Sequence, residues 1–435
     1  MSLTLIGLSG IVLLLLLMFF LAMPVAFAMG IVGLIGFSIV VSFSAGLNMI
    51  GSIAWTTFSQ YGLTVIPMFI FMGQIAFHSG VNEKLYAAAY RWTGQIRGGL
   101  AMATILACSA FSAICGSNAA TAATMSTVAL PEMNRFRYHP KLSCGTVAAG
   151  STLGVVIPPS VVLIVIGLST EQSITKLFYG GVGAGVLLTV LMMLSVVWVC
   201  RMHPDWGPKG PVFSWREKFR SLSGAVEMAV LFLLVMLGLS FGLFTPSEAG
   251  AVGSVLAVGI GVFQGKLGWK GIVAASFDTL KVTCMVVMII TGAVIFGRFL
   301  AVTRIPFDVA GWVVTLPLPK AAILAVIFLI YIIGGMVMDA LALLMVTISI
   351  FFPVAMQLGY DPIWFGVVVT VITTLGAITP PVGATAFVVA GMSPGVSLEE
   401  VFHGVTYFVP AYLLCVALLM LWPDIVLFLP NVMGR

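Results

Sequence analysis

One pattern occurs twice in the sequence and restricts the fold more than any other feature. The first copy begins at Thr152, reads Thr-Leu-Gly, continues for three residues and ends in Pro158-Pro159. The second copy begins at Thr374 and ends in Pro380-Pro381, so the offset is 374 − 152 = 222 residues. The same offset relates three further pairs: Pro131 and Pro353, Tyr138 and Tyr360, and Pro140 and Pro362. One offset shared over about fifty residues without a gap indicates an internal duplication, which in a membrane chain is typical of transporters.

The apolar composition of the chain indicates which class of protein it belongs to. Hydrophobic residues make up 61% of the 435 residues and charged residues 8%, compared with about 25% charged residues in soluble domains. Apolar runs long enough to cross a bilayer begin with Leu3–Met23, which lacks the basic start of a cleaved signal. These runs predict an all-α polytopic membrane protein, since a β-barrel would alternate apolar and polar residues. The net charge is +5. The basic residues behind it are therefore expected to lie in cytoplasmic loops and not on a nucleic-acid-binding surface.

The segment 99–131 has a small, polar centre at Cys115–Asn118 and is otherwise apolar, so it is either a broken span or a re-entrant hairpin. If it is a hairpin, most of the 19 Lys and Arg residues fall on one side of the membrane. The positive-inside rule favours that arrangement. Each half then has five crossings and one hairpin. Because five is odd, the second half is expected to insert upside down relative to the first, which predicts two inverted-topology repeats.

The expected organisation follows from this pattern. The first repeat is residues 1–200, with its hairpin at about 99–131 and its proline-broken helix at about 142–167. Residues 201–223 are expected to form a cytoplasmic linker. The second repeat is residues 224–435, with its hairpin at about 320–353 and its broken helix at about 363–390. An interfacial segment is expected before each hairpin, at Val81–Gly98 and Arg304–Pro319.

The Pro-Pro pairs indicate where chemistry could occur. A proline pair inside a span removes two backbone donors and forces the preceding residue out of helical geometry. Carbonyls near Gly154–Ile157 and Gly376–Thr379 therefore lose their helical partners. In a bilayer such carbonyls must face protein, water or an ion. Uncharged oxygens suit a hard cation such as Na⁺, and exposed N–H groups at the starts of half-helices suit an anionic substrate. A plain proline kink is the alternative at each position.

Two ionisable residues are further candidates. Asp339 lies in the middle of the second hairpin, and its counterpart at the 222-residue offset is Ser117 in the first hairpin. An ionisable residue within the membrane is a functional candidate, with a helix-capping role as the alternative for Asp339. Arg298 could meet a substrate carboxylate or act as a snorkelling anchor. The chain has no G-x-x-x-x-G-K-[ST] motif, so it is not expected to hydrolyse ATP itself. Without a nucleophile–base pair or a metal cluster, the sequence does not predict an enzyme.

Four motifs together resemble one known family: Cys115–Thr121, Leu153–Pro159, Phe244–Ala249 and Leu375–Gly383. Over essentially its whole length the chain resembles the large membrane subunit (M, DctM-like) of tripartite ATP-independent periplasmic (TRAP) transporters. The resemblance implies a Na⁺-driven importer of small carboxylates, such as C4-dicarboxylates or sialic acid, in the bacterial cytoplasmic (inner) membrane. It implies an elevator mechanism, in which a transport domain built from both hairpins and both broken helices moves against a scaffold. The implied partners are a periplasmic substrate-binding protein and a small (Q-type) membrane subunit on a separate chain.

The resemblance also implies two Na⁺ sites, one between each hairpin and the neighbouring break. One would comprise Ser112, Cys115, Gly154, Ile157 and Pro159, and the other Gly335, Gly376, Thr379 and Val382, mostly through backbone carbonyls. At Cys115 a hydroxyl would be the more natural side-chain ligand, so only the backbone carbonyl is expected to serve. The expected substrate residues are Ser117, Asn118, Pro158, Asp339, Pro380 and Arg298.

Two other functions stay open at the level of the sequence. A stand-alone sodium-coupled anion carrier of related two-hairpin architecture would need no binding protein. An ATP-driven permease subunit is less favoured, because the expected repeat is inverted and nothing in the sequence indicates coupling to an ATPase. The sequence does not say which carboxylate is carried.

Overall fold

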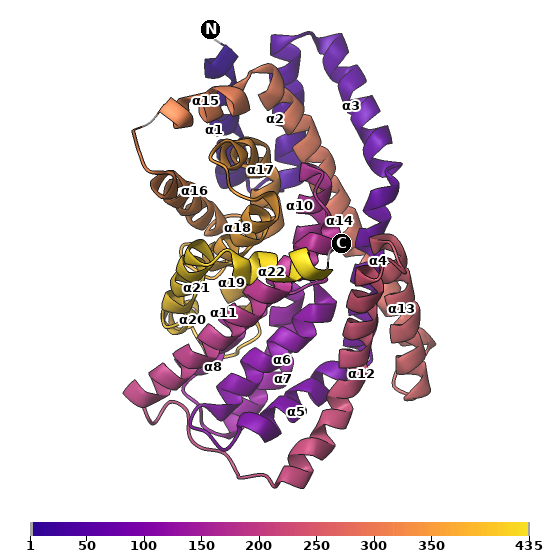
Figure 1. The fold of residues 1–435 in the computed structure, drawn as a ribbon, viewed down its shortest axis with the longest axis vertical. Helices are drawn as coiled ribbons and strands as arrows, with labels where there is room; N and C mark the ends of the chain where they lie inside the picture. The colour runs from indigo at the N-terminus through magenta and orange to yellow at the C-terminus, as the bar shows by residue number, and fades with distance from the viewer. Residues whose placement is uncertain (1–2, 316, 434–435) are drawn as a thin grey trace.

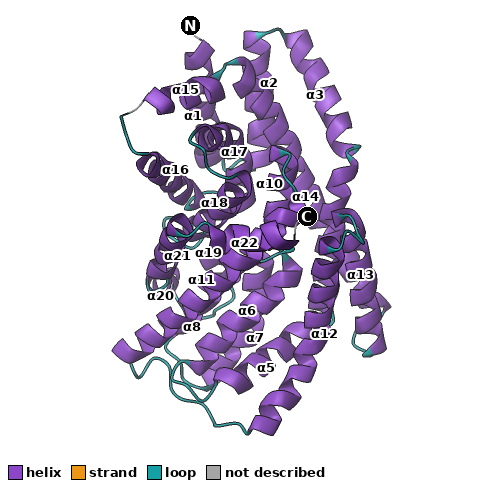
Figure 2. Cartoon of the chain, in the orientation of Figure 1, coloured by secondary structure: helices purple, strands orange, loops and turns teal. Residues whose placement is uncertain are grey.

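The fold is all-helical, as the sequence predicts (Figure 2). A computed structural model describes residues 3–315 and 317–433. Among these residues, seven helices are long and apolar enough to cross a membrane, or up to nine if each bent pair counts as one span. Length and composition thus confirm the expectation of a polytopic helical membrane protein.

The described residues of the first half form eleven α-helices and one 3-10 helix. Their bounds are α1 Leu3–Leu21, α2 Val25–Val40, α3 Phe43–Phe58, η1 Tyr61–Thr64, α4 Val65–His78, α5 Val81–Thr93, α6 Gly99–Cys115, α7 Asn118–Arg135, α8 Pro140–Ser151, α9 Leu153–Val156, α10 Val161–Thr170 and α11 Ile174–Met202.

The second half continues with helices throughout its described residues. Their bounds are α12 Trp215–Ser240, α13 Pro246–Phe263, α14 Trp269–Val302, α15 Ile305–Thr315, α16 Lys320–Gly335, α17 Ala340–Gln357, α18 Pro362–Gly376, α19 Ala384–Gly391, α20 Leu398–Thr406, α21 Val409–Leu421 and α22 Asp424–Met433.

Several helices begin at positions that differ by the offset of the sequence motifs. Helices α7 and α17 begin at Asn118 and Ala340, and α8 and α18 begin at Pro140 and Pro362. The halves differ elsewhere, because α3, η1 and α4 are separate elements, whereas α14 is one helix of 34 residues.

Some boundaries differ from those expected. The second helix of each hairpin continues past the proline taken as its end, so Pro131 and Pro353 lie inside α7 and α17. The expected linker 201–223 is shorter, since α11 extends to Met202 and α12 begins at Trp215. Helix α12 begins there because Ser214 and Glu217 form a capping box, in which each side chain binds the backbone N–H of the other.

The broken helix α8–α10 lies at the centre of the molecule and is almost entirely buried. It packs against α6, α7, α11 and α18. Figure 1 shows α5, α6 and α7 in the lower half of the molecule and α15, α16 and α17 in the upper half. The two hairpins, α6–α7 and α16–α17, therefore approach the central helices from opposite ends.

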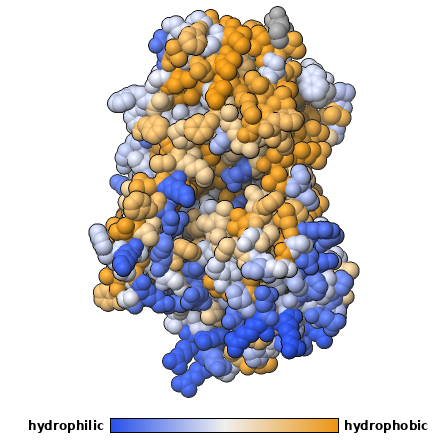
Figure 3. Space-filling view, turned by 180° about the vertical axis from the view of Figure 1, so that it is seen from behind, coloured by the Kyte–Doolittle hydropathy of each residue, from blue (hydrophilic) through white to orange (hydrophobic). Residues whose placement is uncertain are grey.

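Hydrophilic and hydrophobic residues are also separated between the lower and upper parts of the molecular surface. Figure 3 shows that hydrophilic residues gather at the lower end, where Figure 1 places α5 and the nearby ends of α11 and α12. The upper part of this face is mainly hydrophobic. Exposed apolar side chains such as Phe20, Phe43 and Trp55 belong to α1 and α3, which Figure 1 shows in that upper part.

Candidate functional site

The tip of the first hairpin is a tight turn between two helices. Helix α6 ends at Cys115, and Gly116 adopts a left-handed conformation (φ 64°) that reverses the chain direction. Ser117 then caps α7, because its hydroxyl accepts a hydrogen bond from the N–H of Ala120 (3.5 Å). A Cβ added at Gly116 would lie 3.0 Å from the carbonyl oxygen of Pro159. The turn thus brings the hairpin tip against the first break.

The first break runs from Ile157 to Ser160, between α9 and α10. The Pro158–Pro159 peptide bond is cis. Ser160 restarts the helix, since its hydroxyl accepts a bond from the N–H of Leu163 (3.4 Å) and donates to the carbonyl of Val155 (2.6 Å). Contact with the hairpin is close here as well. A Cβ at Gly154 would lie 2.8 Å from the carbonyl oxygen of Ser117.

The second hairpin meets the second break in a corresponding way. A Cβ added at Gly376 would lie 2.6 Å from the Cα of Gly335, so the backbones of α16 and α18 touch. The carbonyl of Met336 accepts hydrogen bonds from the N–H groups of Val382 (3.1 Å) and Gly383 (3.2 Å). Backbone bonds therefore join this tip directly to its break.

The residues proposed for the first Na⁺ site lie around one contact. Ser112 is fully buried near the end of α6, and its hydroxyl has no hydrogen-bond partner among the described residues. Across 3–315 and 317–433, no hydrogen bond is made to the carbonyls of Ile157, Pro158 and Pro159. Buried, unpaired and uncharged oxygens of this kind are the ligands that a hard cation prefers. The residues present therefore fit Na⁺.

The second set is more open. Gly335, Gly376 and Thr379 cluster at the contact between α16 and the end of α18, and the Thr379 hydroxyl donates to the carbonyl of Gly376 (3.0 Å). Val382 follows on the exposed side of the break, with 38% of its surface accessible. The carbonyls of Thr379, Pro380 and Val382 accept no hydrogen bond within the described chain. This donor set also fits Na⁺, with greater access to solvent or lipid.

The two hairpin tips meet at a cavity of about 110 Å³. Its walls come from α4, α14, the first break and both tips. Four of the residues expected from the sequence line it: Cys115, Ser117, Asn118 and Asp339. The side-chain carbonyl of Asn118 is buried and has no partner among the described residues. The helices α7 and α17 begin at this cavity, so the N–H groups of their first turns point towards it.

Asp339 is both a helix cap and a wall of the cavity. Its carboxylate accepts a hydrogen bond from the N–H of Leu341 (3.1 Å), which caps α17. Its side chain is exposed to the cavity. No basic side chain lines this cavity in the described part of the chain. The partial positive charge of two helix N-termini is thus the main favourable field for an anion.

Three expected substrate residues do not line this cavity: Pro158, Pro380 and Arg298. Arg298 is exposed on α14, about 18 Å along the helix from Val286, the nearest lining residue. Sequence reasoning missed Gln74, which lines the cavity from α4. An amide in the middle of the apolar run 63–77 was the available signal, because polar groups in a span usually face the protein interior.

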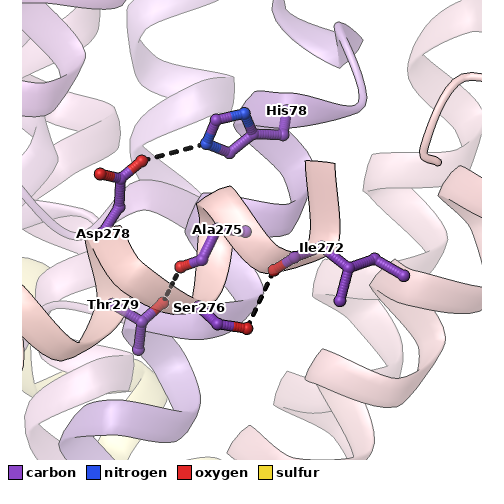
Figure 4. A network of polar contacts seen from close by, with 6 residues as sticks. All are labelled: His78, Ile272, Ala275, Ser276, Asp278 and Thr279. Carbon is purple, nitrogen blue, oxygen red and sulfur yellow. Dashed lines mark hydrogen bonds and ion pairs between the residues drawn. The ribbon is translucent and has the colours of Figure 1, made fainter. Parts of the chain in front are cut away.

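A polar contact joins the two helices that form one wall of the cavity. His78 at the end of α4 and Asp278 in α14 lie within hydrogen-bond distance, with 3.1 Å between Nε2 and Oδ2 (Figure 4). Beside it, Thr279 and Ser276 donate to the carbonyls of Ala275 and Ile272, within their own helix. This contact therefore joins α4 to α14, the two helices that line the cavity together with the hairpin tips.

A cavity that places a few polar side chains, such as Asn118 and Asp339, between interrupted helices of an apolar chain is typical of a membrane transporter. Residues 11–425 match the family model described as "Tripartite ATP-independent periplasmic transporter, DctM component". The chain belongs to this family and is the large permease subunit of a TRAP transporter. It is a transport protein and not an enzyme, as the sequence predicts.

Relatives of the chain are named for different substrates. The chain is 34% identical to the "C4-dicarboxylate TRAP transporter large permease protein DctM" of Pseudomonas aeruginosa, with 87% of this chain and 88% of that protein covered. It is 28% identical to the "Sialic acid TRAP transporter large permease protein SiaM" of Vibrio cholerae, with 95% and 96% covered.

A third relative is the "Isethionate TRAP transporter permease protein DctMQ" of Oleidesulfovibrio alaskensis. It is 31% identical, and the match covers 85% of this chain and 58% of that longer protein. Among solved structures, the YdaH transporter of Alcanivorax borkumensis has a similar fold, with a TM-score of 0.62 at 16% identity. That match covers 87% of this chain and 89% of the other.

Proposed function

We propose that this large permease subunit imports small organic anions, driven by Na⁺, after a periplasmic binding protein delivers them. The observation that carries the proposal is the cavity between the hairpin tips. Two helix N-termini and the Asn118 amide face it, and a set of unpaired carbonyls lies behind each tip. Anion and cation sites side by side are what sodium-coupled uptake of a carboxylate requires.

The cavity also suggests a preference among carboxylates. The N-termini of α7 and α17 would hold one carboxylate through backbone N–H groups, with Ser117 and Asn118 beside it. The carboxyl group of Asp339 would accept a hydrogen bond from a hydroxyl or ammonium group and, when ionised, would repel a second negative charge. Monocarboxylates that carry such donors, sialic acids among them, are therefore favoured over C4-dicarboxylates.

Sodium would be held at the two tip-to-break contacts. At the first contact we assign it to Ser112 and to the backbone around Cys115, Gly154 and Ile157–Pro159. At the second we assign it to the backbone of Gly335, Gly376, Thr379 and Val382. A bound cation would supply the positive charge that the cavity walls lack. Pro158 and Pro380 would act by exposing carbonyls, and Arg298 would act away from the cavity, near one membrane surface.

The proposed mechanism is an elevator built from two inverted repeats. The support is that the hairpins enter from opposite ends of the molecule, while helices of equal offset flank them (Figure 1). Both hairpins and both broken helices would move as one transport domain, past a scaffold that includes α12, α13 and α14. The linker and the hydrophilic lower end in Figure 3 would face the cytoplasm.

The proposed partners complete a tripartite system in the bacterial cytoplasmic membrane. A small Q-type membrane subunit would extend the scaffold, and the fused architecture of the DctMQ relative supports such a partner. A periplasmic substrate-binding protein would dock on the face opposite the hydrophilic end. Membership of a family of tripartite periplasmic transporters supports this partner as well.

Uptake of labelled carboxylates into proteoliposomes tests the proposal. The vesicles would hold this chain and its small subunit, with and without an inward Na⁺ gradient and with and without the binding protein. Uptake that requires both the gradient and the binding protein is the expected result. Uptake that needs only the gradient would identify a stand-alone carrier. Uptake that needs ATP instead would overturn sodium coupling. Labelled sialic acid and succinate, compared in the same vesicles, test the preference attributed to Asp339.

A further inference from the structure

A groove between α6, α11 and α12 lies outside the transport cavity. At its inner end is an apolar cavity of about 300 Å³, lined by Ala110 and Ala113 of α6, Val182 and Val186 of α11, and Met228 and Phe232 of α12. Among the described residues, Ser109 is the only polar side chain that lines it. Figure 1 shows α11 and α12 diverging below this level, with α5, α6 and α7 visible between them.

One face of α11 runs from this cavity towards the lower end of the molecule. Val182, Val186, Val190, Val197 and Arg201 are separated by four or seven residues, so they form one stripe on the helix. Val186 and Val190 are about half exposed. On α6, Leu106, Ala110 and Ala113 have the same kind of spacing and are partly exposed. Two apolar stripes therefore run side by side towards the lower end of the molecule.

A basic pocket closes the lower end of these stripes. Arg97, Arg201 and Lys209 line it together with Gln95 and the side chain of Val197, around a volume of about 570 Å³. No acidic residue from the described part of the chain lines the pocket. None of the three cations has an ion-pair or hydrogen-bond partner in residues 3–315 and 317–433. An unneutralised cluster of this kind attracts an anion.

The distance between the two ends suits one kind of molecule. Val186 at the apolar end and Val197 at the basic end are about 16 Å apart along the helix axis. One leaflet of a bilayer supplies about half of the ~30 Å hydrocarbon core, or roughly 15 Å. Trp198, which is 48% exposed, marks the membrane–water interface beside Arg201. The basic pocket therefore lies at headgroup depth and the apolar cavity near the bilayer midplane.

We propose that this groove binds an anionic phospholipid of the cytoplasmic leaflet. Its phosphate lies among Arg97, Arg201 and Lys209, and an acyl chain follows Val197 and Val190 into the cavity beside Phe232. Basic pockets on the cytoplasmic side of membrane helices commonly hold acidic headgroups. The lipid joins the first half of the chain to α12, the first helix of the second half.

Native mass spectrometry of the purified full chain tests this site. The ligands are phosphatidylglycerol and phosphatidylcholine with 16-carbon chains, each added to delipidated protein. Phosphatidylglycerol is expected to bind, and the combined Arg97→Gln, Arg201→Gln and Lys209→Gln variant should bind it on the order of 100-fold less tightly, about fivefold for each cation. Equal binding of both lipids to the unmodified protein would overturn the role of the basic pocket.

A matched variant separates the pocket from general charge. Arg216→Gln, Lys266→Gln and Lys270→Gln remove the same charge outside the pocket, and phosphatidylglycerol binding should change less than about twofold. An equal loss in both triple variants would show attraction to the whole surface and refute the site. Unchanged phosphatidylcholine binding and a monodisperse elution profile would show that both variants are folded.

A third variant tests the apolar end. Ala229→Phe on α12 narrows the cavity without changing charge. It should weaken binding of the 16-carbon phosphatidylglycerol about tenfold, at a cost typical of overpacking, and leave a six-carbon analogue unaffected. Unchanged binding of the long-chain lipid would exclude the acyl-chain path. Displacement of the lipid by millimolar inorganic phosphate would show an anion pocket alone and would also refute the proposal.

Discussion

The two proline-broken helices share one motif but differ in their surroundings. Residues 151–166 of the first broken helix are all buried, whereas Pro380, Pro381 and Val382 of the second are exposed. The difference in exposure comes from the last long helix of each half, which is α11 in the first half and the pair α20 and α21 in the second. Helix α11 is continuous for 29 residues, but its counterpart is divided into α20 and α21, which are bent by 40°.

Two glycines explain how α11 covers the first break. A Cβ added at Gly181 would lie 2.7 Å from the carbonyl oxygen of Val156, and one at Gly185 would lie 2.4 Å from the Ile157 side chain. The residues at the same positions of the second half are His403 and Tyr407. His403 is exposed, and the ring of Tyr407 packs against Trp198 and Trp206 instead of the second break. Similar breaks are therefore enclosed or open according to the neighbouring helix. In an elevator, such a difference would correspond to the two sides of the membrane.

The largest expected effect tests this difference directly. Gly154→Ala places a methyl group against the Ser117 backbone in an enclosed site that cannot relax, with an expected cost of about 3 kcal/mol, or over 100-fold in uptake. Gly376→Ala meets the Gly335 backbone at a shorter distance, 2.6 Å, but the open break beside it leaves room for the chain to shift. About 1 kcal/mol and roughly a fivefold loss are therefore expected. Uptake of labelled substrate into proteoliposomes measures both.

The control is Gly259→Ala in α13, where an added Cβ has no neighbour within 4 Å. Its uptake should equal that of the unmodified protein. If Gly376→Ala were the more damaging of the two variants, enclosure would not be what distinguishes the breaks.

The second prediction compares the tips. Asp339→Asn keeps a good helix cap but removes the charge from the cavity, so we expect uptake to fall about tenfold with expression unchanged. Asp361→Asn is the matched control, because Asp361 caps α18 outside the cavity and accepts hydrogen bonds from the N–H groups of Ile363 (2.8 Å) and Trp364 (3.0 Å). Normal transport by Asp339→Asn would reduce Asp339 to a cap.

The third prediction concerns the unpaired hydroxyl of the first tip. Ser112→Ala should raise the Na⁺ concentration for half-maximal uptake about fivefold, the effect of losing a neutral ligand worth about 1 kcal/mol. Thermal stability should not fall, because the hydroxyl makes no bond in the described structure. Ser126→Ala removes another buried, unpaired hydroxyl of the same hairpin, away from the break, and should leave the sodium dependence unchanged. Equal shifts in both variants would argue against a sodium ligand at Ser112.

The sequence predicted much of this arrangement because the duplicated motif contains the glycines and prolines that interrupt its helices. Glycines and prolines indicated the tips and breaks within a few residues, and the 222-residue offset related Asp339 to Ser117, which line one cavity. The face that an apolar helix presents to a cavity is not encoded in such a pattern. Met285 and the distant position of Arg298 therefore emerged only from packing. The exposure of the second break also depends on residues far from the motif.

The smallest expected effect compares the caps of the two broken helices. Helix α8 is capped by His139, whose Nδ1 accepts a hydrogen bond from the N–H of Lys141 (3.3 Å), whereas α18 is capped by Asp361. Burial, followed by the nearby charge of Lys141, lowers the pKa of His139. A lowered pKa means that the folded state favours neutral imidazole, so this stabilisation is present above about pH 6.5 and lost as the pH falls.

Between pH 7.5 and 5.5, the first broken helix should therefore lose part of its cap, since a protonated imidazole cannot accept a hydrogen bond. We expect the Tm to fall by about 1 °C more in the unmodified protein than in His139→Asn, because Asn caps at either pH. His403→Asn is the control, since His403 is exposed and pairs only with Glu399 among the described residues. An identical pH dependence in the unmodified protein and in His139→Asn would mean that the two caps are equivalent, and that the halves differ only at their breaks.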